Sequence, residues 1–429
     1  MDPQGRIIIP HGVNFVVKET PFSPLAAGFD ASDASFVAAN GFRVVRLGVL
    51  FGALMPEPGK IDTKYLDQIA QTVNLLAHDH VYVLLDMHQD EYGPAVGVDG
   101  FPKWATLTDG VANPRMSFPA GYFHSPSVQA AWANFWADKP GPGGVGLQER
   151  YDTALRVLAT KFRSDDWVIG YDVMNEPWPG PEYATCETDA GCPALEQTLL
   201  APFYAKAVRA LREADPRHLI FVEPFLTFDY DGNTSLAAFG TPKNGLSFHP
   251  YIAGQVGAGI MGRAISLSNR NEDALLVTEF GATTKAPLIT EFTDGFDAQL
   301  MPWIFWSLNQ YLVTDLHKPP GGANVPSAAA LDALVRPYPL AIAGVPVSFA
   351  FDANSRQFAF DYTSQRAGGG SFEPGTVTEV LTPKSVYPNG YSVVVTGATV
   401  RSKPCASSLT LLAAGPNVSV KVTPGGACN

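Results

Sequence analysis

Two kinds of hydrophobic pattern alternate over about the first 335 residues of the chain. Short runs rich in β-branched residues, such as residues 81–87, are apolar almost without interruption, which is typical of strands buried on both faces of a parallel sheet. Between these runs, apolar residues recur at helical spacing, as at Leu66, Ile69 and Val73. Asp62, just before this segment, is placed to cap the first turn of the helix.

The order of these segments predicts the fold. Eight candidate strands are separated by helical segments or long loops, and eight β-α units predict an α/β fold, the (β/α)₈ TIM barrel, with insertions. The candidate strands are residues 13–15, 44–47, 81–87, 169–174, 219–223, 246–249, 275–279 and 303–306.

The pattern changes at about Pro339. The segments AIAGVPVSFAFD, RQFAFDYTS and GYSVVVTG are short, rich in β-forming residues and separated by Gly, Pro and Asn. Such a series predicts a small antiparallel β-sandwich. We therefore divide the chain into a barrel domain over residues 1–337 and a sandwich domain over residues 338–429.

Composition excludes some classes of partner. The net charge of −12 and the isoelectric point near 5.1 argue against nucleic acid, because phosphate binding needs a basic surface. No apolar run approaches the roughly 20 residues that a transmembrane helix requires. We expect a monomer without a transmembrane span.

The four cysteines indicate the compartment. Cys186 and Cys192 share the polar segment TCETDAGCP, and Cys405 and Cys428 bracket the end of the chain. Four cysteines allow three pairings, of which the local one is the simplest, and zinc sites use closer spacing. Two disulfides point to an oxidising compartment, so we expect a secreted protein. No signal peptide is visible, and Met1 resembles a trimmed start.

Polar side chains recur where the predicted strands end. In a barrel of this type, chemistry collects at the carboxyl ends of the strands. One such residue would be unremarkable, but a series of them predicts a site. The residues are Asn14, Arg46, His88, Asp90, Asn175, Glu176, Glu223, His249, Tyr251, Glu279 and Trp306.

Two of these residues, Glu176 and Glu279, are carboxylates at the ends of the fourth and seventh strands. Glycoside hydrolysis needs such a pair, one to protonate the leaving oxygen and one to attack the anomeric carbon, about 5 Å apart in a retaining enzyme. Asn175 is placed to hold a sugar hydroxyl at C2. Arg46 is expected to keep Glu279 ionised, and Tyr251 to donate a hydrogen bond to it.

Six ordered motifs carry a family resemblance. RLG, DMHQD, NEP, FHPY, TEFG and WIFW, over about residues 5–310, resemble the clan-A retaining glycoside hydrolases of the cellulase-like family five. The resemblance implies that Glu176 is the acid/base and Glu279 the nucleophile. It places at the remaining active-site positions Arg46, His88, Asn175, His249, Tyr251 and Trp306.

A narrower resemblance follows from HGVNFVVK, LDMHQDEYG and GFPKWATLTDG, which are similar to segments of the endoglycoceramidases. A sandwich after the barrel is also similar to that family. The resemblance implies hydrolysis of the β-glycosidic bond between an intact oligosaccharide and ceramide, with glycosphingolipid presented in micelles or at a membrane surface. It also implies that Lys18 and Asp90 contact glycan hydroxyls.

Other functions remain open at this point. An endo-β-glucanase or mannanase would use the same glutamates on a polysaccharide. A noncatalytic glycolipid-binding protein would not need both of them. A metal site of His88, Asp90 and His249 is possible by ligand type, but an amide, a guanidinium and an indole at neighbouring strand ends suit sugar better. We expect neither a metal nor a cofactor.

Several side chains have two interpretations. Glu223 either fills the barrel or supports the catalytic groups. Trp104, Trp132, Trp136 and Trp178 either stack on sugars or only pack, which is the commoner role of buried aromatic residues. For the lipid, the candidate apolar groove comprises the loops at residues 51–56, 225–230 and 254–262.

Overall fold

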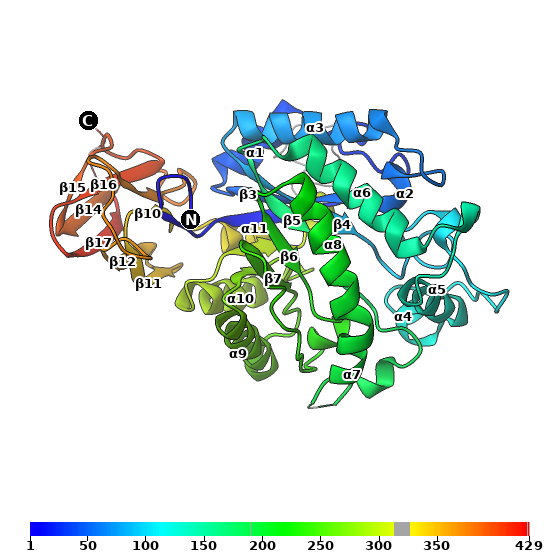
Figure 1. Cartoon of the computed structure of the whole chain (residues 1–429). Coiled ribbons are helices and arrows are strands. Elements are labelled where there is room, and N and C mark those ends of the chain that lie inside the picture. The colour runs from blue at the N-terminus through cyan, green and yellow to red at the C-terminus, as the bar shows by residue number, and fades with distance from the viewer. Residues whose placement is uncertain (189, 313–326, 427, 429) are drawn as a thin grey trace.

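Eight parallel strands form a closed barrel in the order in which they follow one another along the chain. The computed structural model describes residues 1–188, 190–312, 327–426 and 428. It confirms the predicted TIM barrel with an antiparallel sandwich beside it (Figure 1). The barrel strands are β2 (His11–Phe15), β3 (Val44–Leu50), β4 (Tyr82–His88), β5 (Val168–Asp172), β6 (Leu219–Val222), β7 (Asn244–Phe248), β8 (Ala274–Val277) and β9 (Trp303–Phe305).

Helix α3 (Thr63–His78) begins where the sequence pattern indicates. In α3, Leu66, Ile69 and Val73 face the core, and the Asp62 carboxylate accepts a hydrogen bond from the Tyr65 amide as predicted. The described helices are α1 (Ala31–Ala39), α2 (Phe51–Leu54), α3 (Thr63–His78), α4 (Ala120–His124), α5 (Pro126–Trp136), α6 (Leu147–Phe162), α7 (Pro193–Leu195), α8 (Ala201–Ala214), α9 (Gly254–Asn271), α10 (Ala286–Ala298) and α11 (Ala328–Leu334).

Strand alternation divides the barrel interior into layers. Val44, Leu84, Phe221, Leu276 and Ile304 form an apolar cluster inside the barrel. Because side chains repeat on one face of a strand every second residue, the next inward positions form a layer above it. That layer is polar in composition: Arg46, Asp86, Glu223, Thr278 and Trp306.

Aromatic residues fill the long insertion between β4 and α6 and the loop after β5. Trp132, Trp136 and Trp178 are buried, and the Trp136 indole donates to the Trp178 carbonyl at 2.8 Å. Trp104 is half-buried and donates to the Met55 carbonyl at 3.0 Å. These four tryptophans therefore pack and support the loops, which is the second of the two interpretations drawn from the sequence.

The C-terminal strands form two antiparallel sheets. One contains β11 (Val345–Asp352), β12 (Gln357–Thr363), β17 (Asn417–Pro424) and β14 (Tyr391–Thr396). The other contains β10 (Tyr338–Ile342), β13 (Thr378–Leu381), β16 (Ser408–Ala413), β15 (Ala398–Val400) and also β1 (Ile7–Ile8). The start of the chain thus completes a sheet of the sandwich. The division at residues 337 and 338 stays a prediction.

Both disulfides follow the local pairing considered from the sequence. Cys186 is bonded to Cys192, and Cys405 is bonded to Cys428. None of the described helices is long and apolar enough to cross a membrane.

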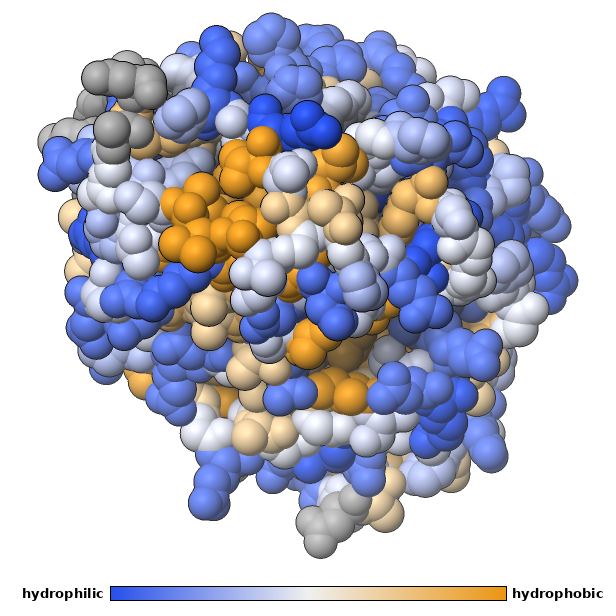
Figure 2. Space-filling model, turned by 90° about the vertical axis from the view of Figure 1, so that its left-hand side faces the viewer, coloured by the Kyte–Doolittle hydropathy of each residue, from blue (hydrophilic) through white to orange (hydrophobic). Residues whose placement is uncertain are grey.

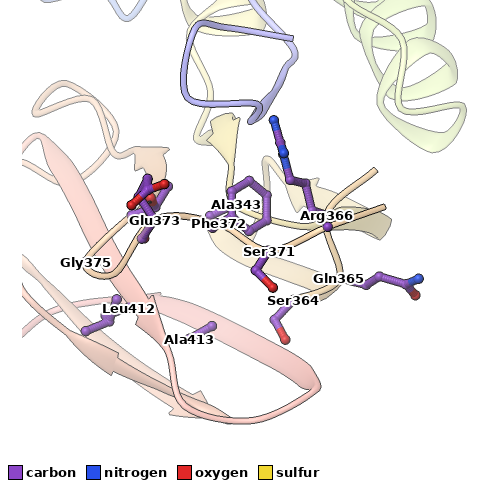
Figure 3. Close-up of a pocket in the computed structure, with 12 residues that line it drawn as sticks. Ala343, Ser364, Gln365, Arg366, Ser371, Phe372, Glu373, Gly375, Leu412 and Ala413 are labelled. Carbon is purple, nitrogen blue, oxygen red and sulfur yellow. Dashed lines mark hydrogen bonds between the residues drawn. The ribbon is translucent and has the colours of Figure 1, made fainter. Parts of the chain in front are cut away.

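The surface of the sandwich has two further features. Seen from the side on which the sandwich lies, apolar residues gather in a patch among polar ones (Figure 2). Val347 and Val394 are the most exposed large apolar residues of the sandwich, at 61% and 69%. A cavity of about 320 Å³ is lined by Arg366, Phe372 and Glu373, among others (Figure 3). All of its lining residues belong to the sandwich, so it is separate from the barrel mouth.

A buried charged pair lies at the junction between the barrel and the sandwich. Arg336, two residues before β10, donates to Asp297 of α10 at 2.7 Å, and both side chains are 2% exposed. Beside them, His11 stacks between Trp303 and Tyr338, with ring centroids 4.2 and 3.8 Å away. The junction is therefore packed as a continuous interior.

This junction makes a testable contribution to stability. Replacing Arg336 by Met leaves the Asp297 carboxylate buried without its partner, so we expect the free energy of unfolding to fall by about 3–5 kcal/mol. Adding Asp297→Asn should restore part of the loss. Urea unfolding followed by fluorescence measures both. Arg401→Met, at an exposed arginine of the sandwich, is the control and should change stability by less than about 0.5 kcal/mol. Equal losses at Arg336 and Arg401 would contradict the assignment.

Candidate active site

One buried arginine holds the centre of the polar layer. Arg46 of β3 is 0% exposed, and its guanidinium donates to side chains from six other positions around the barrel. Its acceptors are Glu279 at 2.6 Å, Asp86 at 2.9 Å, Asp172 and Asn175 at 3.0 Å, Glu223 at 3.2 Å and Asn14 at 3.3 Å.

Four of these acceptors are carboxylates, which is more negative charge than one guanidinium balances. Burial raises the pKa of Asp172 to about 8, although the Arg46 charge opposes the shift. Burial therefore favours the protonated form of Asp172, and protonation of this group lowers the negative charge around Arg46. The carboxylates hold the pKa of Arg46 well above its ordinary value, although burial alone would lower it.

Glu279, just beyond β8, receives two strong hydrogen bonds. Arg46 binds Oε1 at 2.6 Å, and the Tyr251 hydroxyl donates to Oε2 at 2.5 Å. Burial and the Glu279 charge raise the pKa of Tyr251 well above its usual value, so this hydroxyl keeps its proton. Two donors therefore hold and orient the Glu279 carboxyl group.

Glu176, beyond β5, lies in a different environment. Its backbone has φ 45°, and its amide donates to Glu223 Oε2 at 2.8 Å while its carbonyl accepts from Gln89 at 2.9 Å. A positive φ is unfavourable for a non-glycine residue and persists only where neighbours hold it. Burial raises the pKa of this side chain, and the nearby Glu279 charge raises it further, although His249 opposes both.

His249 lies between the two glutamates. Its Nδ1 is 2.8 Å from Glu176 Oε1 and 3.9 Å from Glu279 Oε2. The two glutamate oxygens can therefore be no farther apart than the sum of these distances. This upper limit lies above the separation of about 5 Å typical of retaining glycosidases and only just reaches the inverting range, which starts at about 6.5 Å. The geometry therefore favours a retaining pair.

A second group of charges lies beside Trp306. Lys18 is ion-paired with Asp90, and its ammonium lies 4.4 Å from the Trp306 ring centroid. His88 stacks on the same indole, with centroids 5.4 Å apart, and its Nδ1 lies 2.7 Å from Asp86. Burial lowers the pKa of His88, but the charge and hydrogen bond of Asp86, together with the hydrogen bond of Asp90, outweigh this and raise it to about 10.

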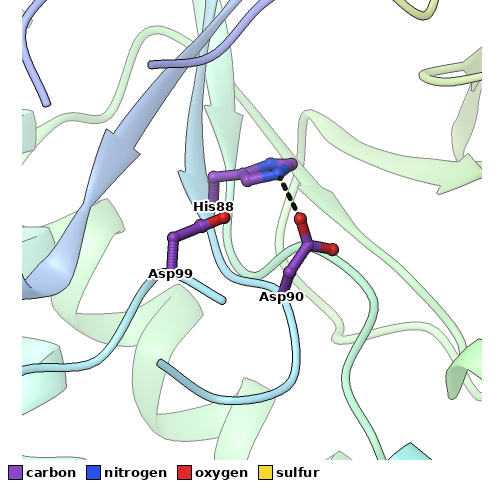
Figure 4. Close-up of side chains that lie close together, drawn as sticks. All are labelled: His88, Asp90 and Asp99. Carbon is purple, nitrogen blue, oxygen red and sulfur yellow. Dashed lines mark ion pairs between the residues drawn. The ribbon is translucent and has the colours of Figure 1, made fainter. Parts of the chain in front are cut away.

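The structure also bears on a metal site. Two groups among the described residues bring three ligand atoms within 4.8 Å of one another. They are His88, Asp90 and Asp99 (Figure 4), and Glu176, Asp229 and His249. In the first group, the Lys18 ammonium already binds Asp90 and the raised pKa of His88 favours a proton on the ring. These residues therefore fit a metal poorly, because cationic groups already occupy its place.

Every site residue predicted from the sequence lies either around Arg46 and the two glutamates or in the group of charges beside Trp306. Glu223 contacts Arg46, His249 and the Glu176 amide, so it supports the catalytic groups rather than merely filling space. Sequence reasoning missed Asp86 and Asp172, although each is an acid inside an otherwise apolar strand. An aspartate within an apolar strand could have revealed them, because a buried acid needs a buried partner.

The candidate apolar groove is largely wrong. Phe51, Leu54 and Met55 of the first loop are buried, and residues 254–262 open helix α9 instead of forming a loop. Phe225 and Phe228 of the remaining loop are also buried. The reason is that these side chains are needed to pack the helices and loops against the barrel.

Other apolar side chains surround the mouth. We call Phe118, Tyr230 and Ile252, which are 52%, 49% and 37% exposed, the apolar rim. The Phe118 ring centroid is 5.9 Å from Lys18 Nζ, and Ile252 follows Tyr251 in the chain. Tyr230 lies close enough to Glu176 for the charge of that carboxylate to contribute to its raised pKa. Tyr230 belongs to one of the predicted loops, and the other two do not.

Comparison with known proteins agrees with the geometry. Residues 16–312 match the model of cellulase (glycosyl hydrolase family 5), and residues 336–423 match the glycoside hydrolase family 5 C-terminal domain. Endoglycoceramidase I of Rhodococcus hoagii is 32% identical, over 100% of this chain and 87% of that protein. Endoglycoceramidase of Hydra vulgaris is 26% identical, over 91% of this chain and 80% of that protein.

A solved structure extends the likeness to the whole fold. Endo-glycoceramidase II from Rhodococcus sp., solved as a lactosyl-enzyme intermediate, superposes with a TM-score of 0.82 at 25% sequence identity, over 99% of both chains. The matched family model spans well over half of this chain, including both candidate glutamates. The chain therefore belongs to glycoside hydrolase family 5.

Proposed function

We propose that this protein is a retaining endoglycosidase that hydrolyses the β-glycosidic bond between the intact oligosaccharide and the ceramide of glycosphingolipids. The observation that carries the proposal is the pair Glu176 and Glu279, which share His249 but differ in their hydrogen-bond partners. Glu279 accepts hydrogen bonds from Arg46 and Tyr251, whereas burial raises the pKa of Glu176 and favours its acid form.

In the first step, the Glu279 carboxylate attacks the anomeric carbon and forms a glycosyl ester. At the same time, the Glu176 carboxyl group gives its proton to the glycosidic oxygen, so ceramide leaves as a neutral alcohol. Asn175, held by Arg46 at 3.0 Å, is placed to bind the 2-hydroxyl of the sugar as the transition state forms.

In the second step, the Glu176 carboxylate removes a proton from water, which attacks the anomeric carbon and breaks the ester. The oligosaccharide leaves, and both glutamates return to their starting states. Glu279 carries no charge while it is esterified, so one of the causes that raise the pKa of Glu176 is then absent. Glu176 is thus more readily protonated in the first step, where it acts as the acid, and more readily ionised in the second, where it acts as the base.

Two features support a glycolipid substrate. Lys18, Asp90, His88 and Trp306 form a polar and aromatic surface suited to a glycan, since they offer donors, acceptors and a ring face. The apolar rim lies beside the same mouth and suits a lipid chain. Relatives that match over most of this chain are named endoglycoceramidases, and two family models match here, one over the barrel and one over the sandwich.

The setting of the enzyme is part of the proposal. Two disulfides suit an oxidising compartment, so we infer secretion, with substrate taken from micelles or a membrane surface. We also infer a monomer, with a catalytic domain over residues 1–337 and a sandwich domain over residues 338–429.

Product analysis tests the substrate. We expect incubation with gangliosides and neutral glycosphingolipids in detergent to release intact oligosaccharide together with free ceramide, detected by mass spectrometry. Cleavage of β-glucan or mannan without release of ceramide would move the function to polysaccharides. Binding of glycolipid without cleavage of any of these substrates would indicate a noncatalytic glycolipid-binding protein.

Replacement of Glu279 by Gln tests the nucleophile. The amide cannot form the glycosyl ester, so we expect turnover to fall by at least about 10⁴-fold while glycan binding changes little. A fluorinated sugar with an activated leaving group should label the wild-type protein covalently and leave the variant unlabelled in intact-protein mass spectrometry. Covalent labelling of Glu279→Gln at the wild-type rate would rule out this nucleophile.

Replacement of Glu176 by Gln tests the acid/base. Substrates with good leaving groups need little protonation, so we expect the first step to be nearly unchanged for them and to slow about 10²–10⁴-fold for glycosphingolipid. The wild-type rate on glycosphingolipid should fall as pH rises through the raised pKa of Glu176, because only the acid form donates. This alkaline decline should vanish in the variant. Equal losses on both substrates would contradict the role.

A further inference from the structure

Asp99 is a buried carboxylate that the proposed mechanism does not use. It lies in the loop after β4, and its backbone pairs with that of Asp90 in an isolated antiparallel bridge. The side chain is 0% exposed, and neither of its oxygens has a hydrogen-bond partner among the residues that the structure describes. Leaving a buried carboxylate without hydrogen bonds is costly, so its presence calls for a physical reason.

The groups that face Asp99 supply that reason. His88 Nε2 is also buried without a hydrogen bond, and ligand atoms of His88, Asp90 and Asp99 lie within 4.8 Å of one another (Figure 4). The charges that act on Asp99 come from His88, Lys18, Asp90 and Asp86. Burial and the Asp99 charge also raise the pKa of the Tyr65 hydroxyl, which stays neutral and so adds no charge to the group.

Asp99 changes the balance of charge in this group. The cations are Lys18 and a protonated His88, and Asp90 binds the first while Asp86 binds the second. Burial disfavours both cations, so their charged forms depend on nearby carboxylates. A third carboxylate behind them adds to that support without competing for the hydrogen bonds that Asp86 and Asp90 already make.

We infer that Asp99 is a positioning residue, whose buried carboxylate helps to hold the cationic His88 and Lys18 side chains in place and directed toward the glycan. The inference rests on the proposed function, since it assigns the glycan to the surface formed by Lys18, His88 and Trp306. Asp99 itself touches no substrate in this scheme, because its oxygens are enclosed.

The two ends of the group behave differently as pH changes. Burial and the Asp90 charge raise the pKa of Asp99 to about 7, while Lys18 keeps Asp90 ionised at lower pH. Support from Asp99 is therefore present above about pH 7 and is lost as its carboxylate is protonated at lower pH. His88, with its pKa raised to about 10, remains protonated across that window.

Asp99→Asn tests the inference, with Asp152→Asn as the matched control. Asp152 is also an aspartate whose pKa burial raises to about 7, but it lies on α6, away from the mouth. In Asp99→Asn we expect the pKa of His88, followed by NMR of ¹⁵N-labelled histidine, to fall by about 1–3 units. We expect KM for an aryl β-lactoside to rise about tenfold with kcat nearly unchanged. Asp99→Glu should restore both values in part.

The outcomes separate this inference from the proposed function. An unchanged His88 titration in Asp99→Asn, or a changed titration with an unchanged KM, would overturn the inference. The inference would also be overturned if Asp99→Asn lost as much thermal stability as Asp152→Asn but changed neither the His88 titration nor KM. If Asp99→Asn does not fold, Asp99→Ser gives the same readouts. Failure of wild-type protein to cleave glycosphingolipid would remove the proposed function, while the His88 titration would still decide the role of Asp99.

Discussion

The ion pair between Arg46 and Glu279 is the interaction on which the rest of the site depends. A fully buried guanidinium is stable only if its donors are satisfied, and six side chains from around the barrel satisfy this one. The same contacts orient Glu279 and Asn175. One cation therefore stabilises the polar layer and directs the groups proposed to attack the sugar.

The two glutamates illustrate how environment assigns different roles to the same side chain. Glu279 is bound and oriented by a guanidinium and a hydroxyl. Glu176 is enclosed, and its strained backbone is held by Glu223 and Gln89. Since His249 contacts both carboxylates, a change of charge on one is transmitted to the other over a few ångströms.

The group beside Trp306 follows the same principle. There, two cationic side chains are surrounded by carboxylates and placed against the Trp306 ring. The apolar rim lies at the edge of the same mouth, where the loops after several strands meet. The sandwich is joined to the barrel away from this mouth, through the packed junction of Arg336, Asp297 and His11.

The sequence by itself determined the order of the eight strands, the sandwich, the disulfides and the residues that end each strand. These features follow from local periodicity and from chain order, which a parallel barrel preserves in space. Only the tertiary structure decided which groups share a proton or a charge. Asp86 and Asp172 needed the closed barrel to meet Arg46, and the apolar rim depended on loops whose packing no periodic pattern predicts. Barrel closure brings together residues that are more than 200 positions apart, such as Arg46 and Glu279, and their separation is set by strand register rather than by sequence spacing.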